Sequence, residues 1–319
     1  MAKVVILEKD TLTNGDMDFT PFYSLGDVEF FNSIKGEDLK NAVKDAEMVL
    51  INKTKYDREL FNASKNLKYI GIFATGYNNV DLVEANERGV VVCNVPSYST
   101  DSVAQLTFSF ILELSSRLSK YNDSTHDGKW IESSTFSYFP YKFSELRGKT
   151  LGIFGLGEIG EKVAKIANAF EMNVISYTRT KKSVLGVTLV SKEELFKNSD
   201  FLTIHCPLTP QTENLVNEQT LSLMKPTAFL INTSRGGVID ENALANALKN
   251  NAIAGAALDV LVKEPMDKNC PLFNLENCII TPHIAWTTVE ARKRLLTVAY
   301  QNAKCFLDGK VQNSVNNKI

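Results

Sequence analysis

The chain has no long apolar run, only three histidines among its 319 residues and no closely spaced pair of cysteines. No stretch reaches the roughly 18–20 apolar residues that a helix needs to span a bilayer, and the apolar part of MAKVVILEKD is too short for a signal peptide. Most of the five cysteines lie in apolar surroundings, which favours buried thiols in a reducing compartment over redox or metal roles. These absences favour a cytoplasmic protein and provide no candidate metal site.

A strong charge of either sign is also lacking. Lys and Arg number 35 against 37 for Asp and Glu, so the formal net charge is only −2. Such a balance gives no field suited to nucleic acid or to an anionic membrane surface. Hydrophobic residues make up 44 % of the chain, which is usual for a globular protein, and the length is sufficient for two domains.

Short runs rich in Val, Ile and Phe alternate with helical stretches along most of the chain. A first series of predicted strands covers 3–8, 27–31, 48–52, 69–75 and 90–96. A second series covers 149–154, 173–178, 187–190, 201–206, 228–234, 254–260 and 277–282. This alternation predicts an α/β fold with two doubly wound parallel sheets, each covered by helices on both faces.

The segment between the two series has a different character. Residues 101–120 are predicted to form one long apolar helix, with Asp101 and Ser102 as capping candidates. Residues 127–149 are dense in aromatics without a clear period, and a partner subunit is favoured over the same chain's surface as the place where these rings are buried. We predict a discontinuous substrate domain of residues 1–100 plus 287–319. Residues 101–286 then form a nucleotide-binding domain that contains a dimerisation arm, 101–145.

GLGEIG at 155–160 follows a predicted strand and opens a predicted helix, which makes this G-x-G-x-x-G match specific. Gly155 allows a tight turn, Gly157 lets backbone amides approach a pyrophosphate, and Gly160 lets the helix pack close to the strand. The helix N-terminus adds partial positive charge for the phosphates. The alternative is an ordinary glycine-rich turn. The predicted cofactor contacts here are Gly155, Leu156, Gly157, Glu158, Ile159 and Gly160.

The next strand ends at Thr178, where NAD sites usually carry a carboxylate that bonds the ribose hydroxyls. Thr178 cannot repel the additional phosphate of NADP, and Arg179, Thr180 and either Lys181 or Lys182 could bind it. This pattern favours NADP as the cofactor, with NAD as the alternative if the basic residues are simply a solvated turn.

Three side chains at strand ends of the second series are candidates for chemistry. His283 follows the last strand, and Arg235 and Glu264 follow two others, so all three can converge at one sheet edge. His126 lies in a polar stretch and is expected to be exposed. His205 is expected to be packed and hydrogen-bonded, with lining of the nucleotide pocket as the alternative.

The chain resembles the D-isomer-specific 2-hydroxyacid dehydrogenases over nearly its whole length, and among them most closely the glycerate dehydrogenases (hydroxypyruvate reductases). The resemblance rests on ATGYNNVDL (74–82), NVPSYSTDSVAQLTF (94–108), GKTLGIFGLGEIG (148–160), HCPLTPQT (205–212), INTSRGGVIDENAL (231–244), GAALDVLVKEP (255–265) and TPHIAWTTVEAR (281–292). It implies a flavodoxin-like substrate domain and a Rossmann cofactor domain with a cleft between them, in a homodimer formed through the arm. It also implies reversible reduction of a small 2-keto acid, such as hydroxypyruvate or glyoxylate, to the D-2-hydroxy acid.

The resemblance also assigns roles to residues. Arg235 would bind and polarise the substrate oxygens, His283 would transfer the proton, and Glu264 would hold the imidazole and favour its protonated form. Further implied cofactor contacts are Val103, Cys206, Pro207, Thr212, Thr233, Asp259 and Ala285. The implied substrate contacts, in addition to Arg235 and His283, are Asn52, Lys53, Thr75, Gly76 and Tyr77.

Three other functions are compatible with parts of this pattern. A formate dehydrogenase of the same fold would carry Gln in place of Glu264, so the carboxylate argues against it. A nicotinamide-sensing corepressor-like scaffold shares fold and triad but usually has extensions beyond the last helix, which we do not expect here. A reductase acting on another small 2-keto acid of the same family stays open, because the sequence does not fix the substrate.

Overall fold

The computed structural model describes residues 1–180 and 182–316, and these residues form two compact units. One unit consists of Met1–Ser99 together with Thr287–Ile319, and the other of Thr100–Trp286. The first boundary lies between Ser99 and Thr100, one residue before the predicted boundary at 100/101. The second lies between Trp286 and Thr287, the position given for it above as 286/287. Residues 317–319 of the predicted substrate domain lie outside the described part of the chain.

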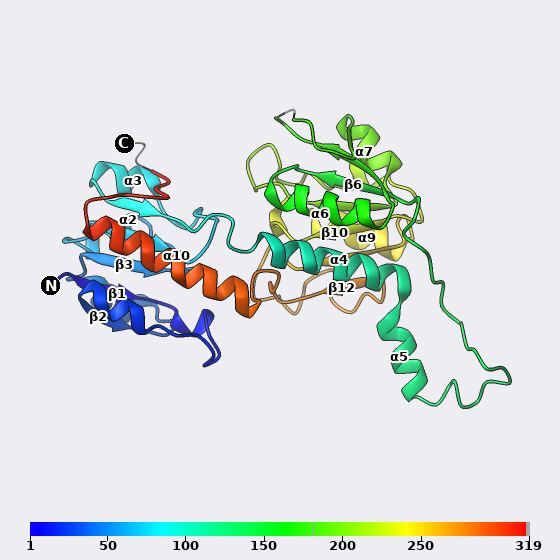
Figure 1. Cartoon of the computed structure of the whole chain (residues 1–319), viewed down its shortest axis with the longest axis horizontal. Coiled ribbons are helices and arrows are strands. Elements are labelled where there is room, and N and C mark those ends of the chain that lie inside the picture. The colour runs from blue at the N-terminus through cyan, green and yellow to red at the C-terminus, as the bar shows by residue number, and fades with distance from the viewer. Residues whose placement is uncertain (181, 317–319) are drawn as a thin grey trace. The chain divides into compact units, whose positions relative to one another are not determined.

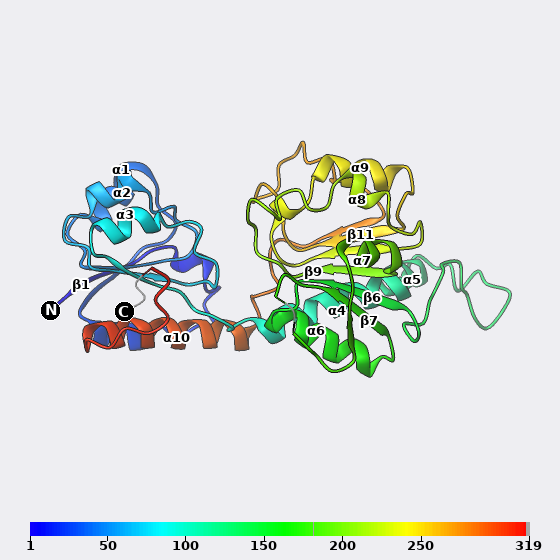
Figure 2. The same ribbon diagram turned by 90° about the horizontal axis from the view of Figure 1, so that it is seen from above.

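The described part of the first unit is built on a parallel five-stranded sheet in the order β2-β1-β3-β4-β5. The strands are β1 (Lys3–Ile6), β2 (Asp27–Phe30), β3 (Met48–Ile51), β4 (Tyr69–Ile72) and β5 (Val91–Cys93). Helices α1 (Gly36–Val43), α2 (Arg58–Ala63) and α3 (Leu82–Glu87) cover one face, and α10 (Val289–Leu307) covers the other, as Figure 2 shows. Every residue of β3 and β4 is buried, as expected for central strands covered on both sides.

The second unit is built on a parallel seven-stranded sheet in the order β12-β11-β10-β9-β6-β7-β8. The strands are β6 (Thr150–Phe154), β7 (Asn173–Tyr177), β8 (Val187–Leu189), β9 (Phe201–Ile204), β10 (Phe229–Asn232), β11 (Gly255–Leu258) and β12 (Cys278–Ile280). Helices α4 (Thr100–Ser116) and α6 (Glu158–Ala169) pack on one face; α7 (Lys192–Asn198), α8 (Glu218–Leu221) and α9 (Glu241–Lys249) lie on the opposite face (Figures 1 and 2).

Both strand orders are those of doubly wound α/β sheets. The order 2-1-3-4-5 in the first unit is flavodoxin-like. In the second unit the six strands β8-β7-β6-β9-β10-β11 follow the Rossmann order 3-2-1-4-5-6, and β12 is added at the edge beside β11. The predicted fold class is confirmed, and each of the twelve predicted strands contains one observed strand. Because all pairings are parallel, the carboxyl ends of the strands within a sheet meet at one edge.

The prediction of one helix over 101–120 was wrong. Helix α4 ends at Ser116, Arg117 adopts a left-handed backbone (φ 56°), and α5 (Leu118–His126) begins next. Two contacts fix the break: the Glu113 carboxylate accepts the Ser119 amide at 3.3 Å, and the Ser115 carbonyl accepts the amide of Ser144 at 3.0 Å. Both halves favour a helix, so their sequence alone does not reveal the turn between them.

The predicted caps of this helix also lie inside it. Helix α4 begins at Thr100, so Asp101 and Ser102 occupy its first turn. Asp101 pairs with Lys162 of α6 at 2.7 Å, and the Ser102 hydroxyl donates to the Ala285 carbonyl. Ser102 therefore connects α4 to the segment that follows β12.

No helix of the described chain is long and apolar enough to cross a membrane.

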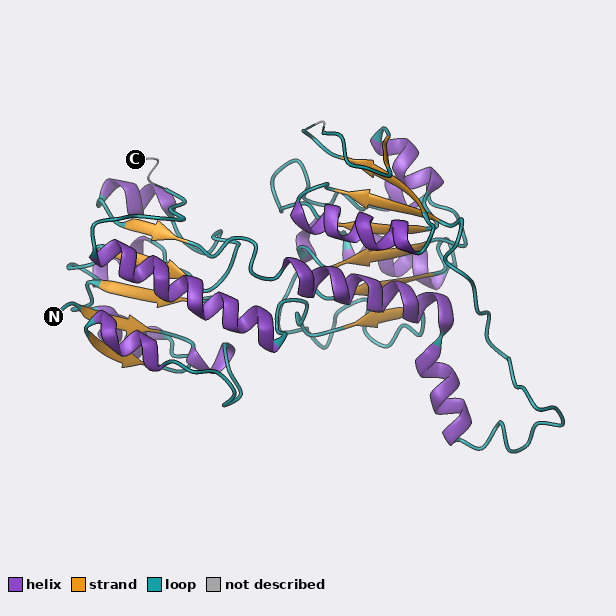
Figure 3. Ribbon diagram, in the orientation of Figure 1, coloured by secondary structure: helices purple, strands orange, loops and turns teal. Residues whose placement is uncertain are grey.

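Residues 127–149 follow α5 as the long loop seen in Figure 3. Several large apolar side chains of this loop are exposed: Ile131 by 89 %, Phe136 by 92 %, Phe139 by 79 % and Phe143 by 73 %. The described part of the same chain therefore does not bury these four side chains, whereas the ring of Tyr141 packs against Tyr121 of α5.

Helix α10 is joined to the N-terminal loop of the first unit by a bidentate ion pair. Arg292 donates to both carboxylate oxygens of Asp16 at 2.6 Å, and this hydrogen bonding lowers the pKa of Asp16 from 3.8 to about 2. Because the folded-state pKa lies below the unfolded one, the pair stabilises the fold fully above about pH 4 and not below about pH 2.

We therefore expect Asp16→Asn to lower the melting temperature at pH 7, and the difference from wild type to shrink as the pH falls from 4 towards 2. Thermal unfolding of both proteins across this range checks the prediction. A difference that stays constant between pH 7 and pH 2.5 would contradict it.

Candidate active site

Arg235, Glu264 and His283 follow three adjacent strands of the second unit. Arg235 lies beyond β10, Glu264 beyond β11 and His283 beyond β12, at the carboxyl edge of the sheet. The sequence places them 19 or more residues apart, and the parallel pairing of the three strands brings their loops to one edge.

His283 and Glu264 are in direct contact. The Nδ1 atom of His283 lies 2.7 Å from Oε2 of Glu264, whose Oε1 accepts the backbone amide of Leu261 at 3.0 Å. Both carboxylate oxygens are thus engaged, and the imidazole is oriented through Nδ1. This leaves Nε2 as the ring nitrogen that can exchange a proton with a ligand, and the side chain is 24 % exposed.

The backbone at His283 has a left-handed conformation (φ 55°), which a buried carboxylate stabilises. Asp259 is 1 % exposed, and its two oxygens accept the Thr281 hydroxyl at 2.6 Å and the amides of Ile284 and Ala285 at 2.8 Å. Burial raises the pKa of Asp259, and these hydrogen bonds oppose the shift. In this structure Asp259 holds the loop that carries His283; the nicotinamide contact predicted for it stays a prediction.

The Arg235 loop packs against the Glu264 loop through a glycine. A Cβ on Gly236 would lie 2.0 Å from the carbonyl of Leu261, so only glycine permits this approach. Asn232 fixes the same turn, since its Nδ2 donates to the Arg235 carbonyl at 2.9 Å and its Oδ1 accepts the Ser234 amide at 2.9 Å. The close backbone approach was expected of the two glycines after Arg235, whereas the role of Asn232, in the same INTSRGG motif, was not predicted.

The glycine turn after β6 fits a dinucleotide. Gly155 has φ +98°, and a Cβ there would meet the His205 carbonyl at 2.8 Å; at Gly160 it would meet the Gly155 carbonyl at 2.3 Å. At Gly157, which precedes α6, a Cβ would meet no atom within 4 Å. Neighbouring backbone therefore leaves no room for a side chain at Gly155 or Gly160, whereas the space beside Gly157 is open. A turn that binds a pyrophosphate needs both features. Leu156, within the turn, is buried.

The basic turn after β7 carries less available positive charge than its sequence suggests. Lys182 forms an ion pair with Glu161 of α6, which neutralises it locally. Thr178 is half-buried, Arg179 and Thr180 are exposed, and Lys181 lies outside the described residues. Within the part of the chain that the structure describes, Arg179 makes no ion pair, so it is the cation left for a phosphate.

Other predicted cofactor residues lie near the start of α4. Val103 is buried in its first turn, and the Thr107 hydroxyl lies 3.2 Å from that of Thr233, at the end of β10. Ala285 is buried, and its carbonyl accepts the Ser102 hydroxyl. This link was not predicted, because the sequence pattern indicated Ser102 only as a helix cap.

The segment beyond β9 contains the remaining predicted cofactor contacts. The Thr212 hydroxyl donates to the Pro207 carbonyl at 2.6 Å and closes the loop. Cys206 is buried, and burial raises the pKa of its thiol to about 11.

His205 is packed as predicted, but the predicted hydrogen bond is wrong, because neither ring nitrogen has a partner among the described residues. Burial lowers the pKa of His205 to about 4, so the ring is neutral at pH 7.

The predicted substrate residues lie in the first unit, beyond β3 and β4. Asn52 is 4 % exposed and donates from its side chain to the Thr11 hydroxyl at 2.9 Å, whereas Lys53 is exposed. The Thr75 hydroxyl donates to the Val95 carbonyl at 2.8 Å, and Tyr77 is exposed. The side chain of Asn52 is thus committed to the protein interior.

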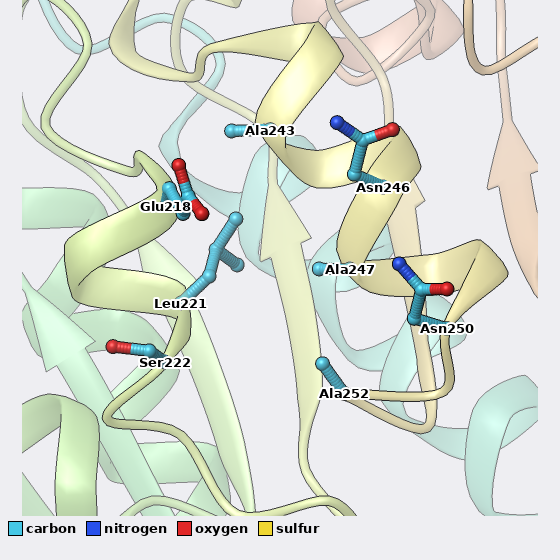
Figure 4. A pocket seen from close by; sticks show the side chains of 8 residues that line it. All are labelled: Glu218, Leu221, Ser222, Ala243, Asn246, Ala247, Asn250 and Ala252. Carbon is cyan, nitrogen blue, oxygen red and sulfur yellow. The ribbon is translucent and has the colours of Figure 1, made fainter.

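A pocket of about 250 Å³ lies between α8 and α9 of the second unit (Figure 4). It is separate from the carboxyl edge of the sheet, where Arg235, Glu264 and His283 lie. None of the predicted site residues lines it. Its walls are Glu218, Leu221, Ser222, Ala243, Asn246, Ala247, Asn250 and Ala252.

Residues 108–285 match the family described as D-isomer specific 2-hydroxyacid dehydrogenase, NAD binding domain. A hydroxypyruvate reductase of Blautia hydrogenotrophica is 38 % identical over 98 % of this chain and 99 % of its own length. The chain therefore belongs to the D-isomer-specific 2-hydroxyacid dehydrogenase family, as its resemblance predicted. It is an oxidoreductase of the class that acts on the CH–OH group with a nicotinamide cofactor.

Two solved structures show the same architecture over the whole chain. An acyclic imino acid reductase, Bsp5, in complex with NADPH and D-Arg has a TM-score of 0.88 at 33 % identity, covering 99 % of this chain and 100 % of its own. The D-lactate dehydrogenase of Aquifex aeolicus complexed with NAD and lactic acid has a TM-score of 0.87 at 29 % identity, with the same coverage. One of these neighbours is thus seen with NADPH and the other with NAD.

We expect Gly236→Ala to lower kcat/KM by about a hundredfold, because the added Cβ would force the Arg235 and Glu264 loops apart. The matched control is Gly237→Ala, whose Cβ would meet only the movable end of the Leu208 side chain, at 3.0 Å. Steady-state kinetics of both variants test the prediction. Equal losses in the two variants would show that the close approach at Gly236 is not what sets the site.

Proposed function

We propose that this protein reduces hydroxypyruvate, and more slowly glyoxylate, to the corresponding D-2-hydroxy acid with NADPH, and catalyses the reverse oxidation. The observation that carries the proposal is the His283–Glu264 pair, held 2.7 Å apart at the sheet edge where the Arg235 loop and the open glycine turn also lie. The hydroxypyruvate reductase relative, similar over its full length, supports the choice of substrate.

A nicotinamide cofactor held at the glycine turn 155–160 would supply the hydride that reduces the keto carbon. The Arg235 guanidinium binds the substrate carboxylate and carbonyl oxygens and polarises the carbonyl. His283 donates a proton from Nε2 to the carbonyl oxygen while Glu264 stabilises the imidazolium through Nδ1, and in the oxidation His283 accepts this proton. The backbone amides of Thr75, Gly76 and Tyr77 hold the substrate carboxylate. A carboxylate at position 264 fits this proton transfer, which formate oxidation would not need.

NADPH is proposed as the preferred cofactor because no carboxylate follows β7. Thr178 cannot repel a 2′-phosphate, and Arg179 and Thr180 are exposed beside it. Val103, Cys206, Pro207, Thr212, Thr233 and Ala285 are proposed to line the remainder of the cofactor site.

We further propose that the protein is a cytoplasmic homodimer in which the arm 101–145 binds the second subunit. The exposed rings of Phe136, Phe139 and Phe143 support this, because so much apolar surface on one loop is typical of an interface. The buried free thiols support a reducing compartment.

His283→Asn is expected to reduce kcat for hydroxypyruvate by about 10²–10⁴-fold, since Asn cannot donate the proton, while the Kd for NADPH changes little. The matched control is His126→Asn, at an exposed position in α5, which should retain wild-type kinetics. Undiminished turnover in the His283 variant would contradict the assignment, and a substrate panel with both cofactors would show whether another 2-keto acid is preferred.

Arg179→Ala is expected to lower kcat/KM for NADPH about tenfold and to leave that for NADH almost unchanged, because a charged hydrogen bond to the 2′-phosphate is lost. Lys182→Ala should have a smaller effect, since Glu161 already pairs with that charge. A wild-type protein that prefers NADH would contradict the assignment of NADPH.

A further inference from the structure

The carboxylate of Glu8 is bound by three consecutive backbone amides of another segment. Glu8 follows β1 in a left-handed conformation (φ 60°) and is 8 % exposed. Its Oε2 accepts the amides of Asn52, Lys53 and Thr54, each at 2.9 Å. Strands β1 and β3 are neighbours in the sheet, so the turn after one strand faces the turn after the other.

Three successive amides that point to one oxygen form a concavity that binds anions. In this protein the concavity lies at the carboxyl end of β3, where the substrate residues Asn52 and Lys53 were predicted. The chain's own carboxylate occupies it, so these amides are not available to the carboxylate of a 2-keto acid. An ionised carboxylate accepts such bonds more strongly than an amide oxygen would.

The same segment is held from its other side by Asn79. The Nδ2 atom of Asn79 donates to the carbonyls of Asn52 at 3.3 Å and Thr54 at 2.9 Å. The Asn79 carbonyl in turn accepts the amide of Tyr56 at 2.8 Å. Asn79 belongs to the loop after β4, which also contains the predicted carboxylate-binding residues 75–77.

A second link joins the Glu8 turn to the 52–54 segment. The Asn52 side chain donates to the Thr11 hydroxyl at 2.9 Å, and that hydroxyl donates to the Glu8 carbonyl at 2.8 Å. Continuous hydrogen bonding therefore runs from Glu8 through 52–54 to Asn79. Removing the Glu8 charge would weaken the amide side of this network, because one buried and two partly buried amides would lose their charged acceptor.

We propose that Glu8 is a positioning residue for substrate binding: it fixes segment 52–54, and this segment, through Asn79, holds the loop 75–77 in the conformation that receives the substrate carboxylate. The inference rests on the proposed function, because that function assigns the loop 75–77 to the carboxylate of the 2-keto acid. Glu8 does not touch the reacting atoms. Its effect falls on recognition of the 2-keto acid rather than on the proton-transfer pair of the second unit or on the cofactor.

Glu8→Gln should raise the KM for hydroxypyruvate about tenfold, with kcat within about threefold of wild type and the KM for NADPH unchanged. The matched control is Asp81→Asn in the same unit, where a carboxylate accepts the amides of Val83 and Glu84 at the start of α3. It should lower the melting temperature without a comparable change in this KM. A Glu8→Gln protein with wild-type KM, or with equal losses for substrate and cofactor, would overturn the proposal.

Asn79→Ala provides an independent variant if Glu8→Gln does not fold. It breaks the network from the carbonyl side and should produce the same selective rise in KM for hydroxypyruvate; an unchanged KM would overturn the proposal.

Hydrogen exchange on the intact protein separates this inference from the proposed function. Faster exchange of the amides 52–54 in Glu8→Gln is expected whatever the substrate is. Absence of turnover by the wild type with every 2-keto acid would refute the proposed function instead.

Discussion

The arrangement at the carboxyl edge of the second sheet depends on one buried carboxylate, that of Asp259. It accepts three hydrogen bonds from residues on both sides of His283 and so stabilises a left-handed backbone at a non-glycine residue. With this loop fixed, the imidazole lies 2.7 Å from Glu264, whose other oxygen is bound to the Leu261 amide. Leu261 is also where Gly236 makes its close approach, so the loops carrying all three catalytic candidates are connected.

The two units use the same physical device. In each, a carboxylate at a strand end is bound by backbone amides of a neighbouring loop: Asp259 by the amides of Ile284 and Ala285, and Glu8 by those of residues 52–54. A carboxylate accepts several amides at once, which restricts a loop more than a single neutral hydrogen bond does. These contacts are between carboxylates and backbone amides, so they do not involve the imidazole of His283 or the side chain of Lys53.

Much of this organisation could be predicted from the sequence because it rests on local patterns. The strands are short, apolar and β-branched, and the family motifs identify Arg235, Glu264, His283 and the glycine turn. What the sequence could not show were contacts between distant segments, such as the Lys182–Glu161 pair and the Asn52 side chain turned towards Thr11. Nor could it show that the His205 ring lacks a hydrogen-bond partner among the described residues. The break at Arg117 was missed because both flanking segments favour a helix.

By itself, the sequence determined that this chain forms two parallel sheets, that one of them carries a dinucleotide turn, and that it belongs to an oxidoreductase family. These properties follow from periodicity and from motifs within short stretches. Only the tertiary structure decided which charges are already satisfied and which loops are held together. Those outcomes depend on the pairing of strands far apart in the chain, as between the turns after β1 and β3, where Glu8 meets the amides of residues 52–54.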